Sequence, residues 1–342
     1  MRKRHLWRLA IGLAALILAA LPGAAQTYTA TDLGTLGANS QSNFSEAYCI
    51  NSSGQVGGLS SSSVPSEPDP AFLYSGGLLT SLGTLGGEYG AAQGINTAGQ
   101  LAGYSTLSAG SYRAFLYTDA QMTNLGTLGG DYSVAYGLND AGQVVGVSAL
   151  ANLQQHAFLY SNGTMTDLGT LGAAPSTATG INNSGAVVGY SYNAAGNFLG
   201  FVYRQGRMTA IGTLGGSWSI AYAINDLGQI TGQAYTTNNL QAHAFRLTAG
   251  KMTDLGTLGG SNSYGNAINR AGEVVGLATA KNASYRAFVS FHGQKMRDLN
   301  TMIPAGTGWV LEEATGVNAV GQIVGWGTLN GATRAFLLTP TH

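Results

Sequence analysis

Two acidic residues stand beside aromatic rings at corresponding places of a repeated pattern in this sequence. Glu88 precedes Tyr89, and Asp131 precedes Tyr132 in the next copy of the pattern. Two carboxylates that flank a glycosidic bond can act as acid and base in its cleavage. Because these acids are not repeated in every copy, they are candidates for the asymmetric active site of a polysaccharide hydrolase or lyase.

Aromatic and short polar side chains recur where the chain passes from one copy of the pattern to the next. Such an amphipathic set suits sugars or extended peptides. The candidate ligand-binding residues are Glu88, Tyr89, Asp131, Tyr132, Trp218, Tyr264 and Trp309. The structural alternative is that Tyr89, Tyr132 and Trp218, which share one repeat position, cover the ends of neighbouring units. Ser217 and Ser261 replace the acids in later copies, as expected of a tolerant surface position.

Other motifs that would carry chemistry are absent from the sequence. It has no zinc-type spacing of Cys and His, no Asp-rich calcium loop, no P-loop ending after the GTLGG runs and no Gly-x-Ser-x-Gly elbow. His156 and His243 share a repeat position that elsewhere holds Arg, Pro or Leu, which predicts a structural hydrogen bond rather than metal ligation. We therefore expect no metal and no cofactor, and we assign no catalytic residue.

One pattern fills the chain seven times, at intervals of 43 to 49 residues. Between its copies come an Asn-x-x-Gly turn, a GQVVG-like strand and an Ala-Phe strand, without a convincing helix. Its LGTLG core, which varies in two copies, opens at Leu33, Leu82, Leu125, Leu168, Ile211, Leu255 and Leu299. The periodicity predicts a chain built from similar β units.

Four short strands fit within one period. Residues 133–139 form an extended segment rich in small side chains, and a tight turn begins at Asn139, in which Asn can bond the backbone ahead and Gly can take a positive φ. Residues 143–148, 156–160 and 165–168 supply the other strands. Because the turn recurs in every copy, it indicates a requirement of the backbone rather than a reactive site.

A period of this length with four meandering strands is typical of a β-propeller blade. We expect an all-β, seven-bladed propeller of four-stranded antiparallel blades over residues 26–342, with the small-residue strands innermost. Residues 28–33 form a fourth strand alone and residues 314–338 supply three strands, so their pairing would complete the last blade and close the ring. A parallel β-solenoid is the second candidate, although it would not need complementary fragments at its ends.

The consensus of MTDLGTLGG, GIN-x-x-GQVVG and HAF resembles the HAF-repeat family of bacterial extracellular proteins. HAF itself occurs at His156 and His243, and the resemblance covers essentially all of the chain after residue 25. Gly200 replaces the alanine of Ala-Phe in one copy, and LNTMIP replaces LGTLGG in the last; both departures are local. The resemblance implies an extracellular repeat protein and no established activity, so no catalytic residue is carried over.

The first 25 residues have the composition of a secretory signal peptide. Four basic residues precede an apolar run over residues 9–21, and the small residues that follow suit cleavage after Ala25. A membrane anchor is the alternative, but the apolar run is short for a spanning helix. We therefore expect a secreted or periplasmic protein without a membrane span after cleavage.

The charge balance of the remaining chain bears on its partners. Without the leader, 11 Lys and Arg remain against 15 Asp and Glu, a net charge of −4. A mildly acidic chain without basic clusters argues against nucleic acids and anionic membranes as partners. Cys49 is the lone cysteine, which excludes an intramolecular disulfide, so packing must provide the stability.

The lengths of the connections suggest where a ligand would bind. In a four-stranded meander, the connections between strands two and three lie on the same face as those between blades, and here these connections vary while the opposite ones are tight. Variable loops on a rigid scaffold often carry binding residues. We favour a monomeric, non-enzymatic binding or scaffold module that recognises a glycan or an extracellular protein or peptide on this variable-loop face. The hydrolase or lyase remains the alternative.

Overall fold

The computed structural model describes residues 26–341 apart from 38–42, 63–67 and 293, so the predicted signal peptide lies outside the described residues. Strands dominate this part of the chain, which also contains one short 3-10 helix. In chain order the elements are β1 (Thr27–Asp32), β2 (Ser45–Ile50), β3 (Val56–Ser60), β4 (Ala71–Ser75), β5 (Leu78–Gly83), β6 (Gly86–Ile95), β7 (Leu101–Leu107), β8 (Tyr112–Thr118), β9 (Gln121–Asn124), β10 (Gly129–Leu138), β11 (Val144–Leu150), β12 (Gln155–Ser161), β13 (Thr164–Asp167), β14 (Gly172–Ile181), β15 (Val187–Asn193), β16 (Phe198–Arg204), β17 (Arg207–Ala210), β18 (Gly215–Ile224), β19 (Ile230–Thr236), β20 (Ala242–Thr248), β21 (Lys251–Asp254), β22 (Gly259–Ile268), β23 (Val274–Ala280), β24 (Tyr285–Ser290), β25 (Arg297–Asp298), η1 (Leu299–Thr301), β26 (Trp309–Val317), β27 (Ile323–Leu329) and β28 (Ala332–Thr341).

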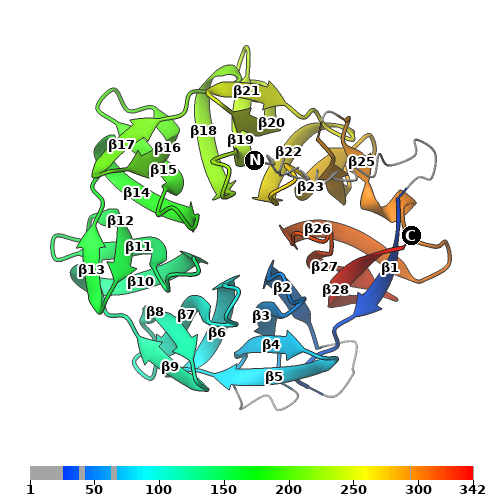
Figure 1. Cartoon of the computed structure of the whole chain (residues 1–342), viewed down its shortest axis with the longest axis horizontal. Helices are drawn as coiled ribbons and strands as arrows, with labels where there is room; N and C mark the ends of the chain where they lie inside the picture. The colour runs from blue at the N-terminus through cyan, green and yellow to red at the C-terminus, as the bar shows by residue number, and fades with distance from the viewer. Residues whose placement is uncertain (1–25, 38–42, 63–67, 293, 342) are drawn as a thin grey trace, which may run out of the picture.

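Strands that follow one another in the chain pair into antiparallel sheets around a common axis (Figure 1). Four sheets keep the chain order, namely β2 to β5, β6 to β9, β10 to β13 and β14 to β17. Strands β18 to β25 form one sheet of eight, whose two four-stranded halves meet at the parallel pair of Ala242 and Asn262. In each unit the first strand lies nearest the axis, as predicted for the small-residue strands (Figure 1).

Both ends of the described chain share one sheet, with the order β1-β28-β27-β26. β1 pairs antiparallel with β28 along its whole length, from Thr27 opposite Thr341 to Asp32 opposite Phe336. The lone N-terminal strand therefore supplies the fourth strand that the C-terminal repeat lacks, and it covers the edge of β28 that would otherwise be unpaired.

The inner strands extend further upstream than the small-residue pattern predicts. β10 begins at Gly129 rather than at residue 133, and its pairing with β11 is irregular between Gly129 and Ser133. Asp131 and Tyr132, which the sequence places in a crossing between sheets, thus belong to the first part of a strand. The small residues mark the regular part of the strand, whereas the irregular part tolerates larger side chains.

The Asn-x-x-Gly turns have the expected structural role. Asn139 Oδ1 accepts hydrogen bonds from the main-chain N–H groups of Ala141 and Gln143, at 3.1 and 3.0 Å. Gly142 has a φ of 72°, a left-handed conformation that glycine adopts without strain. The turn is therefore fixed by its own side chain and by the glycine that ends it.

The turn asparagines also bond to one another around the axis. In each of them the Nδ2 group donates to the main-chain carbonyl of the corresponding asparagine in the next repeat, at 2.8 to 3.2 Å. The series begins at Asn51 and returns from Asn318 to Asn51. We call this set the asparagine belt, and its members are Asn51, Asn96, Asn139, Asn182, Asn225, Asn269 and Asn318. All seven are buried, so each bond satisfies a carbonyl that water does not reach.

The last glycine of each GQVVG-like strand lies where a side chain cannot fit. A β-carbon at any of these positions would come within 1.8 to 2.1 Å of a main-chain oxygen of the inner strand. The inner strand bulges beside this point, as between Ala135 and Gly137 opposite Gly146. The glycines concerned are Gly58, Gly103, Gly146, Gly189, Gly232, Gly276 and Gly325. Close approach of two backbones thus explains the repeated glycine.

The Ala-Phe strands form the core between sheets, as predicted. Phe158 of β12 packs with Val144 of its own sheet and with Ala102 and Leu125 from the preceding repeat. The corresponding phenylalanine of every repeat is fully buried, at Phe72, Phe115, Phe158, Phe201, Phe245, Phe288 and Phe336. Each buried ring contributes about 2–3 kcal/mol to folding. The contacts between units therefore come from apolar packing without a disulfide.

Arg246 interrupts this apolar pattern. Its repeat position holds Leu or Val in the other copies, yet the side chain is only 6% exposed. One guanidinium nitrogen, Nη2, donates to the carbonyl oxygen of Ser290 at 3.2 Å, while Nε has no hydrogen-bond partner within the described chain. Burial lowers the pKa of this guanidinium. The incompletely paired buried charge of Arg246 therefore destabilises the folded state.

We expect Arg246→Leu to raise the free energy of unfolding by about 1 kcal/mol, because it removes the buried charge and restores the side chain of the other repeats. Urea denaturation followed by tryptophan fluorescence measures the change, and Arg204→Leu at an exposed site is the control. A lower stability of Arg246→Leu would mean that the bond to Ser290 outweighs the desolvation of the guanidinium.

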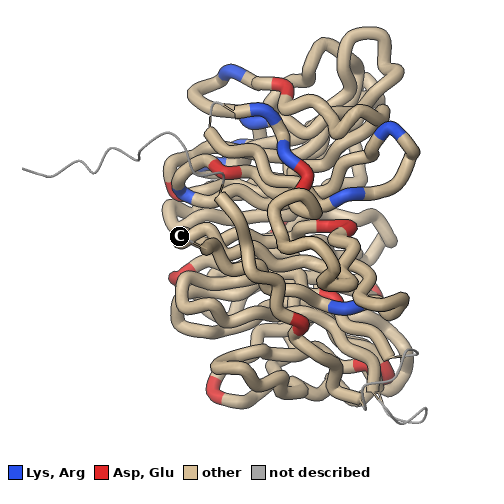
Figure 2. Tube along the Cα trace, turned by 90° about the vertical axis from the view of Figure 1, so that its right-hand side faces the viewer, with Lys and Arg blue, Asp and Glu red and all other residues tan. Residues whose placement is uncertain are grey.

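Charged residues are sparse and unevenly distributed. Figure 2 shows most Lys and Arg segments in the upper part of the view, interspersed with Asp and Glu segments and not joined in a continuous basic band. Within the residues that the structure describes, no helix is both long and apolar enough to cross a bilayer.

Candidate functional site

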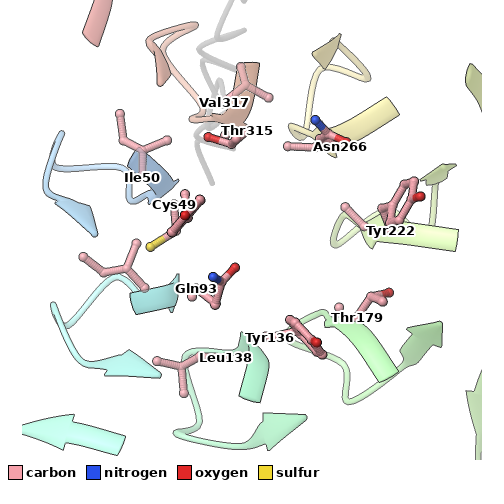
Figure 3. A pocket seen from close by; sticks show the side chains of 18 of the residues that line it. Cys49, Ile50, Gln93, Tyr136, Leu138, Thr179, Tyr222, Asn266, Thr315 and Val317 are labelled. Carbon is pink, nitrogen blue, oxygen red and sulfur yellow. The ribbon is translucent and has the colours of Figure 1, made fainter. Parts of the chain in front are cut away.

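The inner strands place three layers of side chains around the axis. We name them by their chemistry, in order from the variable-loop face towards the asparagine belt. The carboxylate layer contains Glu46, Ala91, Val134, Thr177, Ile220, Tyr264 and Glu313; the polar layer contains Tyr48, Gln93, Tyr136, Thr179, Tyr222, Asn266 and Thr315; the apolar layer contains Ile50, Ile95, Leu138, Ile181, Ile224, Ile268 and Val317. Figure 3 shows Gln93, Tyr136, Thr179, Tyr222, Asn266 and Thr315 of the polar layer gathered around one space, each on a different strand.

These layers enclose a cavity on the axis, which we call the axial cavity. Its volume is about 720 Å³, and it is lined from the inner strands β2, β6, β10, β14, β18, β22 and β26 together with Tyr190 of β15 and Trp326 of β27. Sites for small molecules usually measure about 300–1,000 Å³. The cavity is therefore large enough to hold a ligand of several rings.

Two carboxylates lie in the wall of the axial cavity. Glu46 Oε2 accepts a 2.5 Å hydrogen bond from the Tyr48 hydroxyl, and Glu313 Oε1 accepts a 2.8 Å bond from Asn266 Nδ2. Burial raises the pKa of Glu313; the bond from Asn266 opposes this shift, and the negative charge of Glu46 adds to it. Glu46, on the neighbouring strand β2, is thus close enough to Glu313 on β26 to influence the ionisation of Glu313.

The tyrosines of the polar layer stay protonated over the physiological range. Burial raises the pKa of Tyr136 to about 12, with smaller contributions from nearby tyrosines. The pKa of Tyr48 is raised further by burial and by Glu46, and that of Tyr222 by burial and by neighbouring acidic groups. The phenol of Tyr136 therefore offers both a donor and an acceptor to a ligand, whereas the hydroxyls of Tyr48 and Tyr222 donate to Glu46 and Gln233.

The polar layer divides into groups used by the fold and groups that face the cavity without a partner. The hydroxyls of Thr179 and Thr315 donate to the carbonyl oxygens of Ala221 and Ala47, both at 2.8 Å. The side chains of Gln93 and Tyr136 form no hydrogen bonds with the described residues and line the cavity. An amide and a phenol are thus available for ligand hydroxyl groups.

Among the described residues that line the axial cavity, none is Lys, Arg or His. Its ionisable wall consists of the carboxylates Glu46 and Glu313 and of neutral tyrosines. An anionic ligand would meet two carboxylates without a compensating cation, so the electrostatics favour a neutral or cationic ligand.

The acids that the sequence suggests as candidates, Glu88 and Asp131, lie outside the axial cavity. Glu88 and Asp131 are exposed near the starts of β6 and β10, and Tyr89 beside the first of them is 47% exposed. Neither Glu88 nor Asp131 lines the axial cavity. The structure therefore does not place these two carboxylates in the cavity that would hold a substrate.

Trp218 belongs to a row of packed aromatic rings. The row leads from the upstream ends of the inner strands, which we call the rim, to the axial cavity. Its ring stacks on Phe198 with centroids 5.8 Å apart, and it lies 5.2 Å from Tyr235. Phe198 in turn lies 4.8 Å from Tyr190, which lines the axial cavity. Tyr132 is half-buried near the same tyrosine, and the desolvation of its phenol raises its pKa. These rings pack neighbouring sheets together and also lead towards the cavity.

The two remaining candidates have different surroundings. Tyr264 is half-buried in the carboxylate layer of β22. Trp309 meets Phe336 edge to face, with centroids 6.0 Å apart, and packs on the buried cluster that includes Leu311. The contacts of Trp309 are those of a core residue.

Glu46 and Glu313 are not among the candidates that the sequence suggests, although Glu313 stands close to Trp309, because the recurrent aromatic rings point to the crossings between copies and not to the inner strands. Aligning the repeats at the Asn of each turn puts both acids at one position, where the other copies carry Ala, Val, Thr, Ile or Tyr. Charged residues at an otherwise uncharged position of an inner strand are the signal that would have found them.

The two HAF histidines bond within their own sheets, in agreement with the predicted structural role. His156 Nδ1 lies 2.8 Å from Asp167 Oδ2, and His243 Nδ1 lies 2.9 Å from Asp254 Oδ2. Burial alone would raise the pKa of Asp254, but the bond to His243 and the N–H of Gly256 lower it below its ordinary value. No group of three or more metal-binding side chains occurs among the residues described.

Sequence comparisons leave the family of the chain open. No family model matches the sequence. No curated protein matches it either.

Solved structures resemble this fold at low sequence identity. The β-propeller domain of the Trilobed protease from Pyrococcus furiosus has a TM-score of 0.58 and 8% identity, with 87% of this chain and 95% of that chain covered. A puromycin-hydrolysing peptidase from Mycobacterium tuberculosis has a TM-score of 0.53 and 13% identity, with 86% of this chain and 52% of that chain covered. This chain thus spans about half the length of that peptidase.

Likeness at such identity concerns the fold alone. The match to the Trilobed protease covers almost all of a β-propeller domain, and the strand order of this chain consists of antiparallel meanders around an axis. The protein is therefore an all-β propeller scaffold built from four-stranded antiparallel units.

Proposed function

We propose that this protein is a secreted, non-enzymatic binding module that holds a glycan in the axial cavity. The observation that carries the proposal is a cavity of about 720 Å³ whose wall combines tyrosine rings with the free amide of Gln93 and the free hydroxyl of Tyr136. Aromatic faces cover the apolar side of a sugar ring, and amide and phenol groups bond its hydroxyls. An extracellular peptide is the other ligand class that the sequence suggests.

The ligand enters from the variable-loop face in this proposal. The carboxylate and polar layers precede the apolar layer along each inner strand, and the asparagine belt follows at the opposite end. Six residues of the apolar layer, all except Ile268, form the wall of the axial cavity next to the belt. A polar ligand thus meets its partners near the variable-loop face and an apolar surface beyond them.

We also propose how many blades the ring has, how the ring closes, which family the chain belongs to and where the protein resides. Seven sequence periods, the belt bond from Asn318 to Asn51 and the pairing of β1 with β28 support a seven-bladed ring closed by the N-terminal strand. The repeat consensus supports membership of the HAF-repeat family, and the first 25 residues support secretion after cleavage.

Tyr136→Ala is expected to weaken glycan binding about tenfold, because removal of a central aromatic anchor costs on the order of 1–2 kcal/mol. Trp218→Ala, which alters the rim and leaves the polar layer intact, is the matched control and is expected to bind nearly as well as the wild type. Binding of the purified protein to neutral and amino-sugar oligosaccharides is measured by titration calorimetry, after circular dichroism has verified both folds. Loss of binding in Trp218→Ala alone would move the site to the rim.

A polysaccharide hydrolase is the second candidate function, and one observation favours it. Glu46 and Glu313 lie in one cavity, and burial keeps the pKa of Glu313 above its ordinary value, as a general acid requires. In this version Glu313 protonates the leaving oxygen and Glu46 assists water, so these acids replace Glu88 and Asp131. Mass spectrometry of the same oligosaccharides tests it: a hydrolase releases products that Glu313→Gln abolishes, whereas a binding module releases none.

A further inference from the structure

We infer that the glycan carries a free amino group, and that its ammonium ion binds between the carboxylates of Glu46 and Glu313 in the axial cavity. The inference rests on the proposed function and names the ligand class of the same site. An oligosaccharide of glucosamine units has this chemistry. Four observations carry the inference: the charge of the cavity wall, the unused acceptor positions of its two carboxylates, the aromatic rings around them, and the neutral groups opposite.

The charge of the cavity wall is unbalanced. Glu46 and Glu313 lie in it without a Lys, Arg or His among the described lining residues. A carboxylate in such a place is costly unless a cation or several donors compensate for its lost hydration. A bound ammonium group would supply that compensation.

Each carboxylate retains acceptor positions for a ligand. Glu46 accepts from the Tyr48 hydroxyl, and Glu313 accepts from Asn266 Nδ2 and from Trp326. An ionised carboxylate can accept about four hydrogen bonds, and an ammonium group has three donors. Each acid can therefore accept a further bond from an ammonium group while the existing bonds hold the acid in place.

Aromatic rings surround the same part of the cavity. Trp326 lies close enough to bond Glu313, and the ionisation of Tyr48 and Tyr222 is also influenced by that carboxylate. The indole N–H of Trp326 and the hydroxyl of Tyr48 point at the two carboxylates and hold them in place. Because Tyr48 and Tyr222 stay neutral, the rings add no charge that would compete with a bound ammonium group.

Neutral groups across the cavity from β26, the strand of Glu313, would hold the rest of the sugar. Figure 3 shows Gln93 and Tyr136 across the cavity from Asn266 and Thr315. The amide and phenol on that side bond hydroxyl groups without a charge preference. An amino sugar would therefore match both walls, with its amine at the acids and its hydroxyls at the amide.

The test compares three trimers that share the β-1,4-linked glucose backbone: the glucosamine trimer, the N-acetylglucosamine trimer and cellotriose. Titration calorimetry with the wild-type protein is expected to show the glucosamine trimer binding at least tenfold more tightly than the other two. Equal affinities for all three trimers would overturn this inference and leave the proposed function standing. Binding of none of them would overturn both.

Variants assign the preference to the two acids. Glu313→Gln keeps an oxygen for Asn266 and removes the charge, so the preference for the glucosamine trimer is expected to fall about tenfold while binding of cellotriose is unchanged. Glu46→Gln is expected to act in the same direction. Glu88→Gln, which removes an exposed carboxylate outside the cavity, is the matched control and should retain the full preference. An undiminished preference in both cavity variants would overturn the inference.

A peptide control separates the two ligand classes. A capped Gly-Lys-Gly peptide carries one ammonium group without a sugar, and it is expected to bind at least tenfold more weakly than the glucosamine trimer. Equal or tighter binding of the peptide would show that the cavity selects a cationic side chain of a protein, and this result would overturn the assignment to an amino sugar.

The pH dependence gives an independent readout. Glu46 and Tyr48 on β2, Tyr222 on β18, Asn266 on β22 and Trp326 on β27 face Glu313, and Glu46 is the other carboxylate among them. Since the pKa of Glu313 is raised, this acid takes up a proton early as the pH falls and loses its attraction for a cation. Affinity for the glucosamine trimer is therefore expected to decrease towards acidic pH in the wild type and to change less in Glu313→Gln. The same pH profile in both proteins would overturn the role of Glu313.

Discussion

Gly276→Ala is expected to lower the free energy of unfolding by about 3 kcal/mol or more, the largest effect of a single methyl group in this protein. A β-carbon at this position would lie 1.8 Å from the main-chain oxygen of Tyr264 and 3.0 Å from a ring carbon of Phe288. The oxygen belongs to the backbone of β22 and cannot rotate away, so β22 and β23 must separate. Urea denaturation followed by circular dichroism measures the loss.

Gly163→Ala is the matched control for this prediction. Gly163 lies in an exposed hairpin with a φ of 80°, and a β-carbon there would meet no atom within 4 Å. The same chemical change thus introduces backbone strain without a clash, and we expect a cost of about 1 kcal/mol. Similar costs for Gly163→Ala and Gly276→Ala would show that the sheet relaxes around the added methyl group.

Asn318→Ala is expected to lower the free energy of unfolding by about 2–3 kcal/mol. The substitution removes the bond from Nδ2 to the buried carbonyl of Asn51 and the bonds that Oδ1 accepts from the N–H groups of Val320 and Gln322. Buried polar groups that lose their partners cost about 1–3 kcal/mol each. Denaturation in urea, with the slope of the transition compared between variants, measures the effect.

Comparing the stability loss of Asn139→Ala with that of Asn318→Ala tests whether the ring is closed. Asn139 makes the same bonds, at 3.1 Å to the carbonyl of Asn182 and at 3.1 and 3.0 Å from its turn N–H groups, but it lies away from the chain ends. If the ring is closed, the two variants should lose equal stability within about 0.5 kcal/mol. A clearly smaller loss for Asn318→Ala would indicate that β2 and β26 separate in solution.

The fold could be predicted largely because each repeat contains the residues that its own local structure requires. The turn beginning at Asn139 needs a side-chain acceptor and a glycine, and Gly146 is required by a backbone contact within the same sheet. Such local requirements appear in the sequence as a period. The early start of β10 was missed because its irregular pairing with β11 imposes no alternation of side chains on residues 129–132.

The candidate site could not be predicted in the same way, because it depends on what differs between the repeats. Glu46 and Glu313 are far apart in the sequence and become neighbours through the approach of β2 to β26. The recurrent aromatic rings of the rim resemble a binding surface in the sequence. In the structure, however, Trp309 packs against Phe336 and Trp218 packs against Phe198. Residues that recur in every repeat identify the scaffold. Residues that differ between the repeats form the wall of the axial cavity.

The asparagine belt has an electrostatic consequence for the other end of the axis. All of its amide groups donate in the same rotational sense, so the circle is homodromic and its tangential dipoles cancel around the ring. The tangential component of these bonds therefore adds no net attraction for cations or anions on the axis. The potential at this mouth is then set by the side chains just beyond the belt, where Asp140, Asp226 and Arg270 line a smaller pocket. The two openings of the axis therefore differ in polarity because of single residues and not because of the repeated backbone.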